Sequence, residues 1–237
     1  MTDQYPVFIP IRNCLTTLVE LIRWLESVDQ HEIWLIDNAS TYGPLVRFLD
    51  TTPHRVVRLH HNLGHRSPWL SGTVQRYAHQ RFFIVSDPDV LPDPMCPTDA
   101  LERFRTLLDL HPEMDKVGFG LRIDDLPAHY PLSDDVLDWE SPFWDPEREI
   151  EPGAFRADID TTFAMYRPMD GRHRPGFALR TGKPYVARHL PWYKDPATLT
   201  EEDHYYRKHA DPTISNWDRD ELPWWKQRRL VNPDSTH

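Results

Sequence analysis

The stretch Phe-Phe-Ile-Val-Ser-Asp-Pro-Asp, residues 82–89, joins a run of apolar side chains to two carboxylates. The apolar run predicts a buried strand, after which Asp87 and Asp89 lie in a loop. In open α/β sheets, ligands bind outside the carboxyl ends of the strands, where this motif is expected to lie. Carboxylate oxygens are ligands that Mg²⁺ and Mn²⁺ prefer, so the motif suits a divalent cation that bridges to a phosphate-bearing substrate. The alternative is an ordinary turn, because Asp and Pro are common turn residues.

Strands and helices are expected to alternate upstream of this motif. Each strand pattern is a short apolar run that ends in polar residues, and each helix pattern places apolar side chains at helical spacing. This alternation is typical of βαβ units, which build a parallel sheet with polar loops at the carboxyl ends of the strands. The expected strands are residues 7–11, 32–37, 55–59 and 82–86, and the expected helices are residues 15–25, 45–49 and 74–78.

Four polar motifs follow the expected strands. They are Pro-Ile-Arg-Asn at 10–13, Asp-Asn-Ala-Ser at 37–40, Asn-Leu-Gly at 62–64 and Asp-Pro-Asp at 87–89. In order and spacing, these motifs resemble those of the nucleotide-sugar glycosyltransferases of the GT-A fold, in particular family 2 and its relatives. The resemblance implies an α/β fold with a Rossmann-like, mostly parallel central sheet flanked by helices, and a loop-rich acceptor half. It also implies a single domain over 1–237, in which residues 1–95 bind the nucleotide-sugar and residues 96–237 bind the acceptor.

The resemblance further implies a metal-dependent transfer of a sugar from a nucleoside-diphosphate donor, expected to be a UDP-sugar. Mn²⁺ or Mg²⁺ would neutralise the leaving diphosphate as a Lewis acid. In the family the last Asp of the motif holds the metal, so Asp89 is the main expected ligand, while Asp87 meets the ribose or reaches the metal through water. Metal sites of this fold are often completed by a distant histidine. His189, at the end of an extended stretch, is the expected third metal residue.

Recognition of the nucleotide is assigned to the first loops. In similar enzymes the aspartate of the second motif reads the uracil N–H, which assigns that role to Asp37. Asn38 and Ser40 are expected to shape the turn, and a surface role is the alternative for Arg12 and Arg66. The residues expected to contact the nucleotide-sugar are Pro10, Ile11, Arg12, Asp37, Asn38, Arg66, Asp87, Pro88 and Asp89.

The second half of the chain is expected to supply the general base. An inverting transfer, which we favour over a retaining one, needs a carboxylate that removes the proton of the acceptor hydroxyl. Asp160 and Asp158 are the candidates, because alternate residues of an expected strand share one face. Glu201 or Glu202, or a retaining mechanism, are the alternatives. The expected elements are helix 99–110, strand 116–123, an aromatic acceptor loop 126–156, strands 157–166 and 176–180, an extended stretch 185–193 and helix 201–208.

The composition of the chain limits the classes of binding partner and the expected location of the protein. The 237 residues carry a formal net charge of −10, which argues against a nucleic-acid binder because phosphate neutralisation needs a basic surface. No apolar run has the length of a membrane span, so neither a membrane span nor a signal peptide is expected. Two cysteines give no disulfide framework, so a cytoplasmic location is expected. The expected acceptor is a sugar, a glycan or a glycolipid.

One further class of protein is disfavoured by the sequence, and two others remain as alternatives. A dinucleotide-binding protein is disfavoured, because no Gly-x-Gly-x-x-Gly follows the first expected strand. A sugar nucleotidyltransferase would also use a divalent ion and paired aspartates, but its first loop would normally be rich in glycine. A non-catalytic carbohydrate-binding protein on the same fold would fit the aromatic loops, yet it would have no need of the Asp-x-Asp motif.

Overall fold

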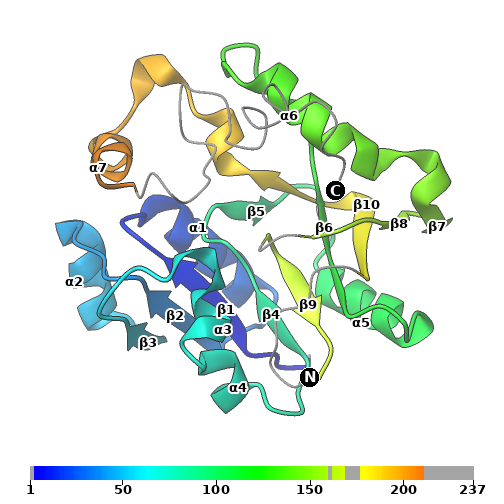
Figure 1. Cartoon of the computed structure of the whole chain (residues 1–237), viewed down its shortest axis with the longest axis horizontal. Helices are drawn as coiled ribbons and strands as arrows, with labels where there is room; N and C mark the ends of the chain where they lie inside the picture. Colours follow the sequence, from blue (N-terminus) through cyan, green and yellow to red (C-terminus); the bar gives the residue numbers. More distant parts are fainter. Residues whose placement is uncertain (1–2, 160–161, 169–176, 211–237) are drawn as a thin grey trace, which may run out of the picture.

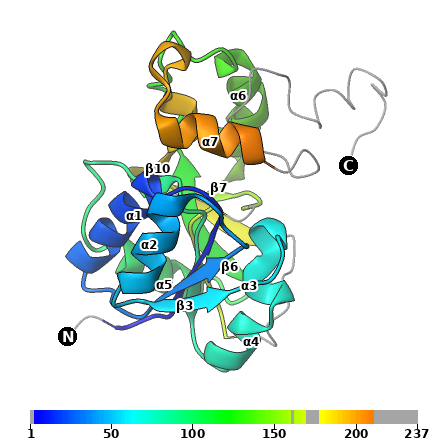
Figure 2. The same ribbon diagram turned by 90° about the vertical axis from the view of Figure 1, so that its left-hand side faces the viewer.

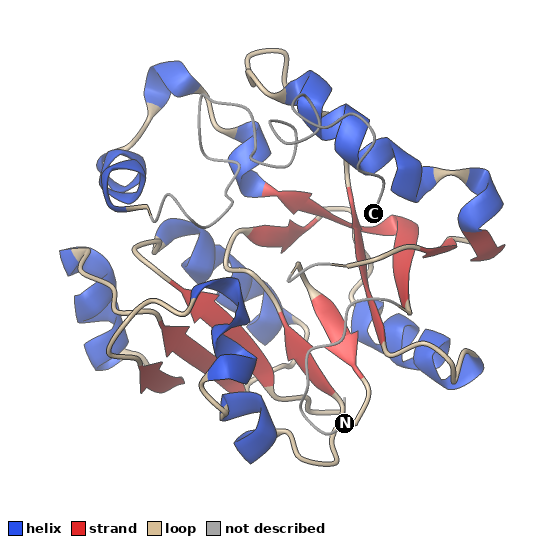
Figure 3. Ribbon diagram, in the orientation of Figure 1, coloured by secondary structure: helices blue, strands red, loops and turns tan. Residues whose placement is uncertain are grey.

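The computed structural model describes residues 3–159, 162–168 and 177–210, which form a mixed α/β fold around one sheet (Figure 1, Figure 3). The ten strands run in the order β3-β2-β1-β4-β9-β6-β10-β8-β7, and β5 pairs with β10 outside this path. The strands are β1 (Val7–Ile11), β2 (Ile33–Asp37), β3 (Arg55–Arg58), β4 (Phe83–Val85), β5 (Val90–Pro92), β6 (Lys116–Leu121), β7 (Glu149–Glu151), β8 (Ala154–Arg156), β9 (Ala164–Tyr166) and β10 (Ala178–His189). The α-helices are α1 (Thr16–Ser27), α2 (Gly43–Thr51), α3 (Ser67–Leu70), α4 (Thr73–Tyr77), α5 (Ala100–Leu110), α6 (Ser133–Glu140) and α7 (Glu201–His209). Short 3₁₀ turns are η1 (Gly64–Arg66), η2 (Ser141–Trp144), η3 (Pro146–Arg148), η4 (Leu190–Tyr193) and η5 (Pro196–Thr198).

The first half is a parallel sheet, as the alternation of strands and helices predicts. Strand β1 pairs with β2 and with β4, and β2 pairs with β3, all in parallel. The register places Ile11 beside Asp37, and Asp37 beside Arg58. The carboxyl ends of β1, β2 and β3 therefore meet at one edge of the sheet, and the first polar loops leave from that edge.

Both faces of this sheet are covered, which explains why every residue of β1 and β2 is buried. Alternate side chains of β1 belong to two separate clusters: Val7 packs with residues of α1, whereas Phe8 packs with residues of α3 and α4. Figure 2 shows α1 and α2 on the opposite side of the sheet from α3 and α4. None of the helices in the described ranges is long and apolar enough to cross a membrane.

The second half departs from a purely parallel pattern at β9. This strand lies antiparallel between β4 and β6, while β6 and β10 run parallel to each other. The expected strand 157–166 is wrong at residues 157–159 and 162–163, because within its described residues the strand β9 covers Ala164–Tyr166. The two extended stretches at 176–180 and 185–193 belong mainly to a single strand, β10, which is followed by η4.

The segment 126–156 is more regular than the expected acceptor loop. It contains α6, two 3₁₀ turns and the strands β7 and β8. Glu140 at the end of α6 pairs with Arg180 of β10 at 2.6 Å, and both side chains are buried. Burial raises the pKa of Glu140, although the Arg180 guanidinium opposes this change. Trp144 lies over Gly120, where an added Cβ would stand 2.7 Å from the indole. This aromatic ring therefore packs on the sheet.

Candidate functional site

Asp37 ends β2 at the edge of the sheet where the first loops gather. Its side chain is buried, and one carboxylate oxygen accepts a hydrogen bond from the backbone N–H of Ser40 at 2.9 Å. The other oxygen lies 3.8 Å from an Nη1 atom of Arg58. Sequence reasoning missed Arg58, since nothing in the motif indicates that a residue at the end of β3 faces Asp37. The aspartate is thus held in a defined orientation by its own loop.

Arg12 and Asn13, which follow β1, brace the loop after β2. Asn13 adopts a left-handed conformation with φ 53°, and its side-chain oxygen accepts hydrogen bonds from the N–H groups of Thr41 at 2.7 Å and Tyr42 at 3.0 Å. Arg12 donates from Nη1 to the carbonyl oxygens of Asn38 at 2.6 Å and Ala39 at 3.2 Å. This guanidinium therefore supports the loop that carries Asp37.

Asn38 connects the loop after β2 to the loop after β3, which contains Asn-Leu-Gly at 62–64. Its amide nitrogen donates to Ser67 Oγ at 3.1 Å, and its oxygen accepts from the N–H of Leu63 at 3.0 Å. The role that sequence reasoning gave Asn38, shaping the turn, agrees with these contacts. Pro10 and Ile11 are both buried, and Ile11 is part of the core cluster with α1. The side chain of Arg66 is exposed and makes no hydrogen bond or ion pair with the described residues.

Asp89 and His189 meet although one hundred residues of sequence separate them. Strand β5 begins at Val90 and pairs antiparallel with β10, so that Val90 lies opposite His189. The carbonyl oxygen of Asp89 accepts a hydrogen bond from the N–H of Leu190 at 2.8 Å. His189 Nε2 consequently stands 3.8 Å from Asp89 Oδ1, with the two side chains 10% and 30% exposed. Asp87 and Pro88 lie beside them and are partly exposed.

The pair fits a divalent cation. Two ligands bound at about 2.1 Å to one ion stand at most about 4.2 Å apart, and the observed 3.8 Å lies within that limit. A carboxylate oxygen suits Mn²⁺ as a donor, and an imidazole nitrogen is the commonest protein donor to metal ions in general. Within residues 3–159, 162–168 and 177–210, no group of three or more His, Cys, Asp or Glu side chains is arranged to hold a metal ion. Water and substrate oxygens would have to supply the remaining ligands.

The N-terminus of α1 is occupied by a carboxylate of the protein itself. Glu202 of α7 accepts hydrogen bonds from the N–H groups of Leu15 at 2.8 Å and Thr16 at 3.1 Å. A helix N-terminus that follows the first strand is a common phosphate site in α/β proteins. Here Glu202 takes those donors, so a diphosphate would have to bind elsewhere. Sequence reasoning considered Glu202 as an alternative base, but its carboxylate caps a helix.

Helix α7 packs beside the Asp37 loop. Tyr205 donates a hydrogen bond to Thr41 Oγ1 at 3.0 Å, and its ring lies 5.0 Å from that of Tyr42. Lys194 pairs with Asp203 at 2.6 Å and connects the helix to the segment after β10. The helix expected at 201–208 is confirmed, and the structure adds that it borders the candidate site.

The proposed base residues are only partly placed. Asp158 is exposed and lies outside any strand, and its carbonyl oxygen accepts a hydrogen bond from Arg180 Nε at 2.7 Å. Asp160 lies outside the described residues. The idea that both carboxylates share one face of a strand is therefore wrong for Asp158. Strand β9 starts beside the motif, since Ala164 pairs with Val85, two residues before Asp87.

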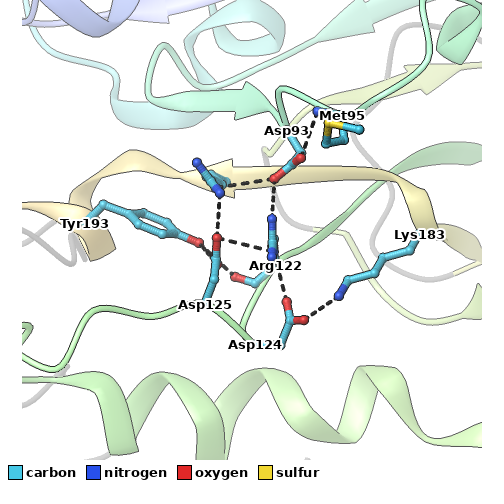
Figure 4. A network of polar contacts seen from close by, with 8 residues as sticks. Asp93, Met95, Arg122, Asp124, Asp125, Lys183 and Tyr193 are labelled. Carbon is cyan, nitrogen blue, oxygen red and sulfur yellow. Dashed lines mark hydrogen bonds and ion pairs between the residues drawn. The ribbon is translucent and has the colours of Figure 1, made fainter.

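Figure 4 shows a network of charged side chains, and one of its members, Arg188, directly precedes His189 in β10. Buried Asp93 accepts from Arg122 Nη1 at 2.8 Å and lies 3.4 Å from Arg188 Nε. Burial acts to raise the pKa of Asp93, but the N–H of Met95 and the two guanidinium groups hold it below its ordinary value. Sequence reasoning missed this network, because its members come from β10 and from the residues after β5 and β6.

Comparisons with known proteins give weak similarities. No protein-family model matches the sequence, and no curated protein matches it. Among solved structures, the fold is similar to glucosyl-3-phosphoglycerate synthase from Mycobacterium tuberculosis, in complex with Mn²⁺, UDP-glucose and phosphoglyceric acid, with 14% identity and a TM-score of 0.41. That alignment covers 68% of this chain and 55% of the synthase, so the chain spans little more than half of its length.

Two further structures align over most of their length. One is named a glucose-1-phosphate thymidylyltransferase from Bacillus anthracis, with 12% identity, a TM-score of 0.39, and coverage of 99% of this chain and 97% of that one. The other is 4-diphosphocytidyl-2C-methyl-D-erythritol synthase from Anaerococcus prevotii, with 9% identity, a TM-score of 0.33, and coverage of 92% and 86%. With TM-scores below 0.5, the assignment of a function depends on the side chains of this chain.

Proposed function

We propose that this protein is a metal-dependent glycosyltransferase that moves a sugar from a UDP-sugar to an acceptor hydroxyl with inversion. The observation that carries the proposal is the 3.8 Å separation of His189 Nε2 from Asp89 Oδ1 next to the Asp-x-Asp motif. Asp89 is partly exposed next to a strand end, so its carboxylate is accessible to a ligand, while His189 is buried beside it. A hard carboxylate and an imidazole that converge at the carboxyl edge of an α/β sheet are typical of a cation site.

Residues 1–95 are proposed to bind the donor. Asp37 would accept the N–H of the uracil base, and its fixed orientation would select a base with a donor at that position. Asp87 and Pro88 would border the ribose, while Arg66, which is exposed, is available to the diphosphate or the sugar. A Mn²⁺ or Mg²⁺ ion held by Asp89 and His189 would stabilise the charge of the leaving diphosphate as a Lewis acid.

Residues 96–237 are proposed to bind a sugar, glycan or glycolipid acceptor and to supply the base. The acceptor oxygen would attack the anomeric carbon as the bond from that carbon to the diphosphate oxygen breaks. The proton of the acceptor hydroxyl would pass to the carboxylate of Asp160, with Asp158 as the second candidate.

A sugar nucleotidyltransferase is less well supported by the site. Such an enzyme must hold a triphosphate, and helix N-termini after the first strand are suited to that task. In this chain Glu202 already accepts the hydrogen bonds from the N–H groups of Leu15 and Thr16. The first loop, Pro-Ile-Arg-Asn at 10–13, contains no glycine that would let a phosphate approach the backbone.

The proposal is tested by thermal denaturation with nucleotides in the presence and absence of Mn²⁺. UDP at one hundred times its dissociation constant should add about 2.7 kcal/mol of apparent stability, and Mn²⁺ should strengthen the effect. Asp89→Asn should remove the Mn²⁺ effect, because a carboxamide is a poorer ligand for a hard cation. Asp134→Asn, an exposed aspartate on α6, is the matched control and should behave as the wild type.

Each outcome of this experiment has a defined meaning. Stabilisation by GDP or CMP without any effect of UDP would contradict the assignment of the base. A response to nucleoside triphosphates alone would favour the nucleotidyltransferase. No response to any nucleotide would contradict the enzyme proposal and favour a non-catalytic carbohydrate-binding protein.

A further inference from the structure

Asp125 lies after β6, and its carboxylate connects two residues that flank His189. One oxygen pairs with Arg188 Nη2 at 2.6 Å, and the other accepts a hydrogen bond from the Tyr193 hydroxyl at 2.6 Å. Arg188 directly precedes His189, and Tyr193 follows it at the end of η4. Figure 4 shows the phenol of Tyr193 pointing toward Asp125. Both ends of the short segment that carries His189 are thus bound to a single carboxylate.

The anchoring of Arg188 by Asp125 also fixes the direction of the His189 side chain. Successive side chains of a strand point to opposite faces, so an anchored Arg188 fixes the direction in which His189 leaves β10. On its own side, His189 packs against Trp192, with the two rings 4.8 Å apart. A rotation of the segment 188–193 would break a contact of Asp125 with Arg188 or Tyr193. These contacts therefore keep the imidazole of His189 beside Asp89.

The charges around Asp125 make these contacts strong. Arg188 is also held by Asp93 at 3.4 Å, and Arg122 connects Asp93 to Asp125 through Nη1 at 2.8 Å and Nε at 3.3 Å. Burial and the Asp125 carboxylate raise the pKa of Tyr193, so its hydroxyl remains protonated and donates. Hydrogen bonds that involve an ionised partner are about twice as strong as those between neutral groups.

We propose that Asp125 is a positioning residue of the metal site, which holds His189 in place to bind a divalent cation together with Asp89. The proposal rests on the proposed function, since it assumes that these two residues bind the cation. Groups that orient metal ligands typically change metal affinity 10–100-fold when they are mutated. Asp125 itself touches neither the cation nor the substrate in this scheme.

Asp124→Asn provides a matched control for Asp125→Asn. Asp124 is the adjacent residue of the same network, but its partners are Arg122 at 2.9 Å and Lys183, neither of which flanks His189. Both substitutions are nearly isosteric and remove one negative charge. A difference between them therefore reports the connection to His189 rather than the loss of charge from the network.

The measurement is the dissociation constant of Mn²⁺, followed by electron paramagnetic resonance of the free ion with UDP at saturation. Asp125→Asn should raise this constant at least about tenfold, whereas Asp124→Asn should leave it close to the wild-type value. The affinity for UDP without metal, measured by calorimetry, should be the same in both variants. Tyr193→Phe removes one of the two contacts without a change of charge and should give a smaller rise.

The results distinguish the two proposals. If the wild type binds Mn²⁺ and the two asparagine variants bind it equally well, the positioning role is wrong and the proposed function stands. If the wild type binds no Mn²⁺ with UDP present, both are wrong. Should Asp125→Asn fail to fold, Tyr193→Phe decides, and a wild-type Mn²⁺ affinity in that variant would overturn the positioning role.

Discussion

Removal of the Glu202 carboxylate is predicted to destabilise the protein through α1, a helix that lies far from Glu202 in sequence. Helix α1 has no side-chain cap of its own, and its first turn contains no acidic residue. Glu202 supplies both the cap and the negative charge. Its carboxylate accepts hydrogen bonds from the N–H groups of Leu15 at 2.8 Å and Thr16 at 3.1 Å, and from the Thr16 hydroxyl at 3.1 Å. A negative charge at this end also interacts favourably with the helix dipole.

The size of the effect follows from these contacts. Loss of a capping side chain costs about 0.5–2 kcal/mol, and hydrogen bonds to a charged group lie at the upper end of the usual range. The N–H groups of this helix end can still reach water, so we expect Glu202→Ala to lower the free energy of unfolding by about 1–2 kcal/mol. In a domain of this size, 1 kcal/mol corresponds to a fall in Tm of about 2–4 °C.

The assay is urea denaturation followed by circular dichroism, with Glu201→Ala as the control. Glu201 is the neighbouring residue in the same first turn of α7, and its side chain is exposed and forms no hydrogen bond with the described residues. Both variants gain the same helix propensity from alanine, so the difference between them isolates the cap. Equal free energies of unfolding in the two variants would refute the reasoning.

Two further predictions concern catalysis and pH. Asp160→Asn should reduce the rate of transfer by about 10²–10⁴ while the affinity for UDP is unchanged, as measured by initial rates and calorimetry; a normal rate would move the base to another residue or favour retention. Asp93→Asn should lower the free energy of unfolding by about 2 kcal/mol at pH 7, because it removes the charged acceptor of the hydrogen bond from Arg122, although Arg122 and Arg188 keep Asp125 as a partner. Since the folded-state pKa of Asp93 lies below its ordinary value of about 3.9, this contribution is fully present above pH 4 and disappears as the pH falls through the folded-state pKa. Urea denaturation of the wild type and of Asp93→Asn from pH 7 to pH 3 checks this prediction. A difference in the free energy of unfolding between the two proteins that grows toward low pH would contradict it.

The sequence alone was sufficient for the parallel strands β1 to β4, although it did not predict α3 or β5. Apolar runs of five residues that alternate with helical spacing specify the buried parallel strands β1 and β2, and these strands and the more exposed β3 were found within a residue of their expected bounds. Helix α5 was expected at 99–110 and is observed at Ala100–Leu110. These features depend on periodicity within a short window, which local sequence encodes directly.

The sequence misjudged elements whose form depends on distant partners. Residues 157–166 alternate in a way that suggests one strand, but among their described residues Ala164–Tyr166 alone form a strand, between β4 and β6. Ala157 and Phe163 each make a single backbone hydrogen bond to the sheet, and the carbonyl oxygen of Asp158 accepts from the Arg180 side chain. The backbone N–H and C=O groups of a strand need hydrogen-bond partners in neighbouring strands, and the sequence of the strand does not indicate which strands these are.

The candidate site shows the same division. The Asp-x-Asp motif and the Asp37 loop are each a local pattern at a strand end, and the sequence was enough to identify them. The approach of His189 to Asp89 depends on the antiparallel pairing of β5 with β10, and the anchoring of His189 depends on Asp125 from a third element. The hydrogen-bond register between strands and the ion pairs between residues distant in sequence are properties of the folded chain, because both are fixed only when the strands have paired.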